Sequence, residues 1–148
     1  MEGKYTKISA LVGIIALAIA IWQIYPKAKY NINGEWKMIS QIEDSSLSTY
    51  KGMTVEWQMF ICENANDIKG TAEKVKINNV ELSAASRTSL EFEGHITDDQ
   101  IVLNYQENGK KRRTSGIITA KLNGDSFEGK FSQTAANTKG RIFAERVE

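Results

Sequence analysis

Four consecutive cations, Lys110 to Arg113, are the residues of this 148-residue chain whose types and spacing best suit chemistry. Guanidinium forks match the geometry of phosphate oxygens, and the lysine ammonium groups add compact positive charges. The run therefore predicts an edge that contacts the phosphate groups of a ligand. The alternative interpretation is a solvated hairpin tip, because such tips also favour charged residues.

Residues suited to catalysis or metal binding are scarce. The chain has one histidine, His95, and one cysteine, Cys62, whereas a structural zinc site takes most of its ligands from these two types. Only His95 could serve as the base of a Ser-His-Asp or Cys-His arrangement. Glu91, Glu93 and His95 are spaced two residues apart, which predicts that all three lie on one solvent-exposed face of a strand. No Gly-Lys-Ser/Thr phosphate loop occurs. We therefore expect no enzyme, no metal and no cofactor.

Apolar and polar residues alternate downstream of residue 33, which predicts short strands with no long helix between them. Val55, Trp57 and Met59 show this period of two. The formal net charge of +1 argues against bulk binding of DNA or RNA polymers. The predicted strands cover residues 35–42, 53–62, 68–77, 89–96, 101–105, 113–122, 126–131 and 140–147.

Antiparallel strands in this number can close into a barrel, which removes the exposed edges of the sheet. Gly94, Gly116 and Gly129 lie within predicted strands, where closure requires tight bends. The sequence therefore predicts an all-β domain over residues 34–148, an eight-stranded antiparallel up-and-down β-barrel. A β-sandwich built from the same strands is the alternative.

The connections between the predicted strands alternate in length. Those around residues 64, 98 and 124 are short, whereas most of those over residues 43–52, 78–88, 107–112 and 133–139 are longer. In an up-and-down meander the two sets lie at opposite ends. The longer loops therefore predict a cup whose mouth carries the binding residues, with Lys110 to Arg113 among them.

An uncharged apolar stretch from Ile8 to Ile24 predicts one membrane-spanning helix over residues 8–25. At about 1.5 Å per residue, the stretch approaches the thickness of a hydrocarbon core. A cleaved signal peptide is the alternative, but this apolar core is longer than usual and ends without a good cleavage pattern. The flanking lysines and the unpaired Cys62 favour a cytoplasmic barrel, whose short turns would face the bilayer.

Asn33-Gly34-Glu35-Trp36 at the start of the first strand and Arg146 near the end of the last resemble the lipocalin-like pattern. In that pattern a Gly-x-Trp tryptophan at the closed base is covered by an arginine from the final strand. Because the ends of a closed meander are neighbours, we expect Trp36 to be buried beneath Arg146. An ordinary core tryptophan is the alternative.

The whole chain resembles the membrane-anchored lipocalin-like β-barrel effectors of bacterial cyclic-nucleotide anti-phage (CBASS) systems. Those effectors typically carry two transmembrane spans, whereas one is visible here. The resemblance implies a non-enzymatic effector in the bacterial inner membrane, in which a cyclic di- or trinucleotide binds the barrel, homo-oligomers form and the clustered helices disrupt the bilayer. Beyond the anchor, it covers Gly34-Glu-Trp36, Val55-Glu-Trp-Gln58, Glu93-Gly-His-Ile96, Phe127-Glu-Gly-Lys-Phe131 and Thr134-Ala-Ala-Asn-Thr-Lys-Gly140.

A phosphate-bearing cyclic nucleotide needs donors for its phosphates and flat surfaces for its bases. Trp57 also fits a core position by its period, and Tyr105 also fits the barrel wall. The alternative function is a membrane-tethered carrier of an apolar small molecule, or a scaffold, with an aliphatic cavity or an exposed apolar patch. The candidate ligand-binding residues are Arg112, Arg113, Arg141, Asn137, Thr138, Tyr105 and Trp57, with Lys111, Arg87 and Tyr50 as further candidates.

Overall fold

The computed structural model describes residues 30–148, which form strands joined by turns and short 3₁₀ helices. The transmembrane helix predicted over residues 8–25 lies outside the described residues. Between residues 30 and 148, no helix has the length and apolar character needed to cross a membrane.

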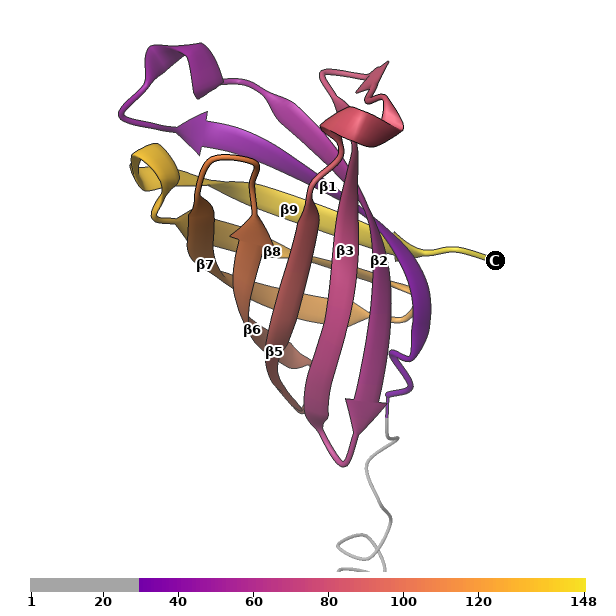
Figure 1. Cartoon of the computed structure of the whole chain (residues 1–148). Coiled ribbons are helices and arrows are strands. Elements are labelled where there is room, and N and C mark those ends of the chain that lie inside the picture. The colour runs from indigo at the N-terminus through magenta and orange to yellow at the C-terminus, as the bar shows by residue number, and fades with distance from the viewer. Residues whose placement is uncertain (1–29) are drawn as a thin grey trace, which may run out of the picture. The chain divides into compact units, whose positions relative to one another are not determined.

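Eight long strands and one two-residue strand make up the sheet (Figure 1). The long strands are β1 (Gly34–Asp44), β2 (Thr54–Asn64), β3 (Asp67–Ile77), β5 (Ser89–Thr97), β6 (Gln100–Asn108), β7 (Arg113–Asn123), β8 (Ser126–Gln133) and β9 (Thr138–Arg146). The short strand is β4 (Val80–Glu81), and the 3₁₀ helices are η1 (Ser48–Tyr50), η2 (Ala84–Ser86) and η3 (Ala135–Asn137).

The long strands form a closed barrel. Each pairs antiparallel with the next long strand along the chain, and β1 also pairs with β9, with Met38 opposite Ala144. The strand β4 pairs only with the end of β3. This topology confirms the predicted eight-stranded antiparallel up-and-down barrel and rules out the β-sandwich.

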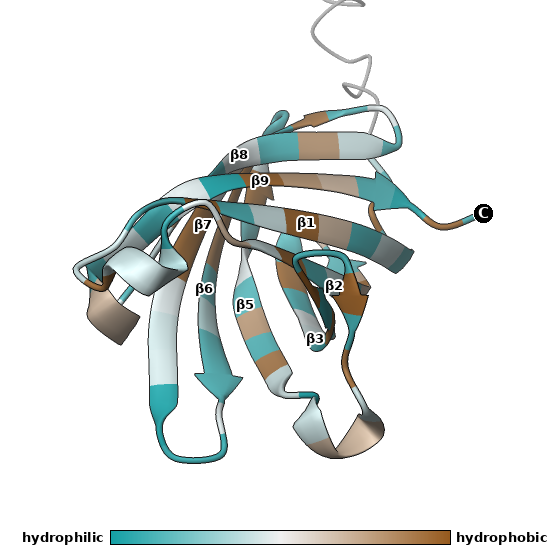
Figure 2. Ribbon diagram, turned by 90° about the horizontal axis from the view of Figure 1, so that it is seen from above, coloured by the Kyte–Doolittle hydropathy of each residue, from teal (hydrophilic) through white to brown (hydrophobic). Residues whose placement is uncertain are grey.

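Buried and exposed residues alternate along the strands. Figure 2 shows bands of hydrophobic and hydrophilic residues along several of the same strands. On β2 the buried residues are Val55, Trp57, Met59 and Ile61, in agreement with the predicted period. Burial of this apolar face is the main driving force for closing the barrel. The largest fully buried side chains are Trp36, Phe127, Ile32, Met38, Met59, Ile68, Ile101, Leu103 and Thr138.

Two of the predicted strand glycines lie where neighbouring strands approach closely. A Cβ on Gly94 would stand 1.9 Å from the Val102 carbonyl oxygen, and one on Gly129 would stand 2.0 Å from the Thr119 carbonyl oxygen. Both distances are far below contact, so the close approach of the strands at these residues requires glycine.

The connections divide the barrel into two ends. The end with the short β2–β3, β5–β6 and β7–β8 turns is called the base. The other end, called the mouth, carries the connections that contain η1, η2 and η3 and the four-residue β6–β7 loop (Figure 1). The predicted separation of short turns from longer loops is therefore present.

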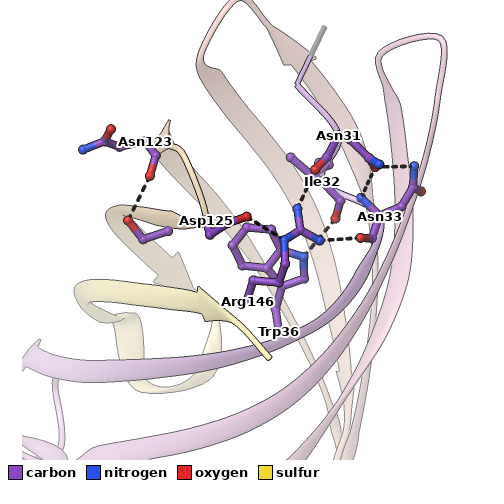
Figure 3. Close-up of polar contacts among 8 residues, drawn as sticks. Asn31, Ile32, Asn33, Trp36, Asn123, Asp125 and Arg146 are labelled. Atoms are coloured by element: carbon purple, nitrogen blue, oxygen red, sulfur yellow. Dashed lines mark hydrogen bonds and ion pairs between the residues drawn. The ribbon is translucent and has the colours of Figure 1, made fainter. Parts of the chain in front are cut away.

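The base is closed by Trp36 beneath Arg146, which confirms that prediction (Figure 3). Trp36 is 0% exposed, and the guanidinium carbon lies 4.6 Å from its ring centroid. Arg146 donates to the carbonyl oxygens of Asn31 and Asn33, and Trp36 Nε1 donates to the Ile32 carbonyl oxygen (2.9 Å). Three consecutive carbonyl groups before β1 are thus fixed to the base.

Candidate functional site

The inward side chains leave a cavity of about 440 Å³ at the mouth, called here the mouth cavity. All four mouth connections contribute to its lining: Tyr50 and Met53 after β1, Thr88 before β5, residues 109–112 after β6 and Ala135 after β8. Small-molecule sites usually have volumes of about 300–1,000 Å³. The mouth cavity is therefore large enough for a small molecule.

Cations dominate the charge of the mouth cavity. Lys110, Lys111 and Arg112 come from the β6–β7 loop and are called here the rim cations. Lys74 on β3 adds a fourth positive charge, and Glu107 on β6 is the one carboxylate in the lining. Four cations and one carboxylate give the lining a net charge of +3, against +1 for the whole chain. The mouth cavity therefore attracts anions.

Lys74 and Glu107 form an ion pair in the cavity wall, called here the inner ion pair. Lys74 Nζ lies 2.5 Å from Glu107 Oε1, and Thr88 Oγ1 donates to the same oxygen (2.9 Å). The Lys74 ammonium also lies 4.9 Å from the Trp57 ring centroid, as a cation–π contact. Trp57 Nε1 in turn donates to Ser40 Oγ (3.2 Å). The wall of the mouth cavity is therefore a connected polar network.

Tyr105 lies next to this network and is almost fully buried. Its hydroxyl group donates to Gln133 Oε1 (2.9 Å), and its ring occupies the space that a side chain on Gly116 would need. Burial raises the pKa of Tyr105 well above its usual value, and the negative charge of Glu107 raises it further. The phenol therefore remains protonated at neutral pH.

The predicted ligand-binding residues fall into three groups. Arg112, Trp57 and Thr138 line the mouth cavity, as do the further candidates Lys111 and Tyr50. Tyr105, Asn137 and, again, Thr138 line a more open groove of about 1020 Å³ that runs over β6, β7, β8 and η3. Arg113 and Arg141 line neither space, and Arg87 pairs with Glu73 (3.1 Å).

The orientation of the strands explains why Arg113 and Arg141 lie apart from the cavity. Thr114 and Ile142 are buried, so the preceding residues on β7 and β9 face outward. Arg141 Nε lies 2.5 Å from Glu43 Oε1 on the outer face. Their positions near the ends of the strands are as expected, but alternation directs their side chains away from the mouth cavity.

Sequence reasoning did not identify Lys74, Thr88 or Glu107. The period of two could have placed Glu107 on the inward face of β6, because Glu107 follows the buried Leu103 and Tyr105 at the same spacing. A charged residue at an inward position near the end of a strand marks a polar wall. Its partner on β3 could be named only from the register of the sheet.

Within residues 30–148, no group of three or more His, Cys, Asp or Glu side chains is arranged to hold a metal ion. Comparison of the chain with models of protein families, with curated proteins and with solved structures found no match.

Proposed function

We propose that this chain is a membrane-anchored, non-enzymatic effector whose mouth cavity binds a cyclic di- or trinucleotide. The observation that carries the proposal is the positive charge of the mouth cavity, whose lining contains Lys74, the three rim cations and a single carboxylate, Glu107. Phosphodiester groups are permanently charged, so they gain from such a lining, and Tyr50 offers an aromatic surface for a base.

The position of the mouth cavity supports a mechanism through oligomers. The chain enters the barrel at the base, where Arg146 and Trp36 hold the carbonyl groups of residues 31–33. The mouth cavity lies at the other end, between the longer connections. A ligand bound there acts on the membrane segment through contacts between barrels, which bring several segments together. It favours the oligomer only by binding it more tightly than the monomer.

The resemblance to lipocalin-like effectors of the CBASS systems gives this proposal its biological setting. Trp36 beneath Arg146 fits a lipocalin-like barrel. In this setting, residues 8–25 cross the bacterial inner membrane once, and the barrel lies in the cytoplasm. A charge in a membrane span costs about 2.5–3.5 kcal/mol on insertion. Ile15→Lys should therefore shift the chain from the membrane fraction to the soluble fraction, and an unchanged distribution contradicts the anchor.

Binding and assembly can be measured on the full chain in detergent. Cyclic di- and trinucleotides are titrated by calorimetry, and sedimentation velocity is recorded with and without each compound. We expect binding together with a higher sedimentation coefficient. Arg112→Glu should weaken the binding, whereas Lys130→Glu, on the outer face, makes the same charge change away from the cavity. Binding without a change in assembly contradicts the oligomer mechanism.

A membrane-tethered carrier of an apolar molecule is the second candidate, because Ile42, Met53, Val55 and Ile77 line the same cavity. The carrier predicts that lipid or another aliphatic compound is extracted from the purified protein. It also predicts no affinity for any cyclic nucleotide. That pair of results replaces the effector proposal with the carrier.

A further inference from the structure

The inner ion pair is costly to bury at the wall of a cavity. The side chains of Lys74 and Glu107 are only 18% and 12% exposed. Removing two charges from water usually costs as much as their attraction returns, and apolar residues of similar size are often as stable. Stability alone therefore does not account for a carboxylate at this place, among the cations that line the mouth cavity.

The Glu107 carboxylate is held as a fixed hydrogen-bond acceptor. Lys74 Nζ and Thr88 Oγ1 both donate to Oε1. Among residues 30–148, no hydrogen bond to Oε2 occurs, and Glu107 lines the mouth cavity. An ionised carboxylate accepts hydrogen bonds and donates none. A ligand in this cavity meets an acceptor that is already oriented by two neighbours.

We infer that Glu107 is a specificity-determining residue of the mouth cavity, which selects ligands that carry an amino group as well as a negative charge. This inference rests on the proposed function. The rim cations bind the anionic part, and Glu107 accepts a hydrogen bond from the amino group. An anion without a donor at that place gives no hydrogen bond to Glu107 Oε2 and is repelled by the carboxylate charge.

For a cyclic nucleotide, the requirement distinguishes the bases. Adenine and cytosine present an exocyclic amino group, which can donate a hydrogen bond to a glutamate carboxylate. Hypoxanthine and uracil have nearly the same shapes, but they present a carbonyl oxygen at the same position, which a carboxylate repels. A site built around a hydrogen bond rejects the analogue that lacks the matching group more strongly than a site built on shape alone. The ligand class is therefore cyclic nucleotides with amino-bearing bases.

The test compares cyclic di-AMP with cyclic di-IMP, and cyclic di-CMP with cyclic di-UMP, by calorimetry on the full chain in detergent. We expect each amino compound to bind at least about 10-fold more tightly than its keto counterpart, as a hydrogen bond to a charged group implies. In Glu107→Gln the preference should fall to about threefold or less, because a neutral amide can accept or donate. Glu73→Gln is the matched control, since Glu73 precedes Lys74 and pairs with Arg87 outside the mouth-cavity lining.

The outcomes separate this inference from the proposed function. Equal binding of the amino and keto compounds by the wild-type chain, or an unchanged preference in Glu107→Gln, overturns the inference while cyclic nucleotide binding stands. Absence of binding to all four compounds and to the trinucleotides overturns both. If Glu107→Gln does not fold because Lys74 is left unpaired, Lys74→Met/Glu107→Leu removes both charges and must also lose the preference.

Discussion

The base and the mouth of the barrel are formed by the same strands, and at each end a cation covers a tryptophan. The pair at the base is packed into the core, whereas the pair at the mouth borders a cavity. At the base, Trp36 is 0% exposed, packs against Phe127 and is covered by Arg146, whose three guanidinium nitrogens each donate to an oxygen acceptor. At the mouth, Trp57 lines a cavity and is covered by Lys74, which pairs with Glu107.

This difference shows how one barrel separates stability from binding. The base buries its tryptophan against the core and fixes the chain that enters β1. At the mouth, charged groups line a cavity, which a barrel filled with side chains would not have. Substitutions at the base should therefore reduce the free energy of unfolding, whereas equivalent substitutions at the mouth should mainly change binding.

The largest effect is expected for the two tryptophans. Trp36→Ala should lower the free energy of unfolding by about 3–5 kcal/mol, because it leaves a large void in a packed layer. Trp57→Ala should cost clearly less, since its site already opens onto the mouth cavity. Thermal unfolding followed by circular dichroism measures both variants. Equal losses would show that base and mouth contribute alike to stability.

The next effect concerns two arginines of β9. Arg146→Met should lower the free energy of unfolding by about 2–3 kcal/mol, because it removes charge-assisted bonds to fixed carbonyl groups and the contact with Trp36. Arg141→Met removes an exposed pair with Glu43 on the outer face and should cost at most about 1 kcal/mol. Denaturant midpoints of the two variants compare them directly, and a larger loss for Arg141→Met contradicts the assignment of the base.

At the mouth, two adjacent arginines test whether the lining or the overall charge controls binding. Arg112 lines the mouth cavity, whereas Arg113 begins β7 and lies outside the lining. Arg112→Glu should weaken cyclic nucleotide binding by about 10-fold or more, as loss of a charged contact implies. Arg113→Glu should have an effect of a few-fold through long-range charge alone. Equal effects would show that the loop acts only through its net charge.

The barrel was predictable from the sequence because alternation and turn residues agree along residues 34–148. The contact between Trp36 and Arg146 was also predictable, since closure makes the first and last strands neighbours. The two-residue strand β4 was not predicted, because two residues carry no period. A register shift between Glu56 and Trp57 was equally hidden in the sequence.

The candidate site was only partly predictable because loops and side-chain directions depend on the register. The cation run was predicted to lie at the mouth, and Lys111 and Arg112 line the mouth cavity. The alternation of β7 and β9 directs Arg113 and Arg141 to the outer face, because Thr114 and Ile142 are buried. Lys74 and Glu107 are 33 residues apart, and their contact follows from the pairing of β3 with β5 and of β5 with β6.

The smallest expected effect locates the boundary between the dry interior and the mouth cavity. Tyr105 is buried, and the charge of Glu107 adds to the burial that raises its pKa in the folded state. In the unfolded state its phenol ionises near a pKa of about 10. Above that pH the unfolded chain loses a proton that the folded chain keeps. The contribution of Tyr105 to the free energy of unfolding is therefore constant below about pH 10 and falls as the pH rises further. At pH 11 this one group should lower the free energy of unfolding by about 1.4 kcal/mol.

Tyr105→Phe isolates this effect from the lysines, which ionise in the same range. The difference in unfolding free energy between wild type and Tyr105→Phe, measured in denaturant from pH 8 to pH 11, should stay constant up to pH 10 and then change by the expected amount. Water that entered from the mouth cavity as far as the Tyr105 hydroxyl, which donates to the cavity-lining Gln133, would solvate the phenolate. The difference would then remain flat, and the boundary between the filled and the open part of the barrel would lie deeper than Tyr105.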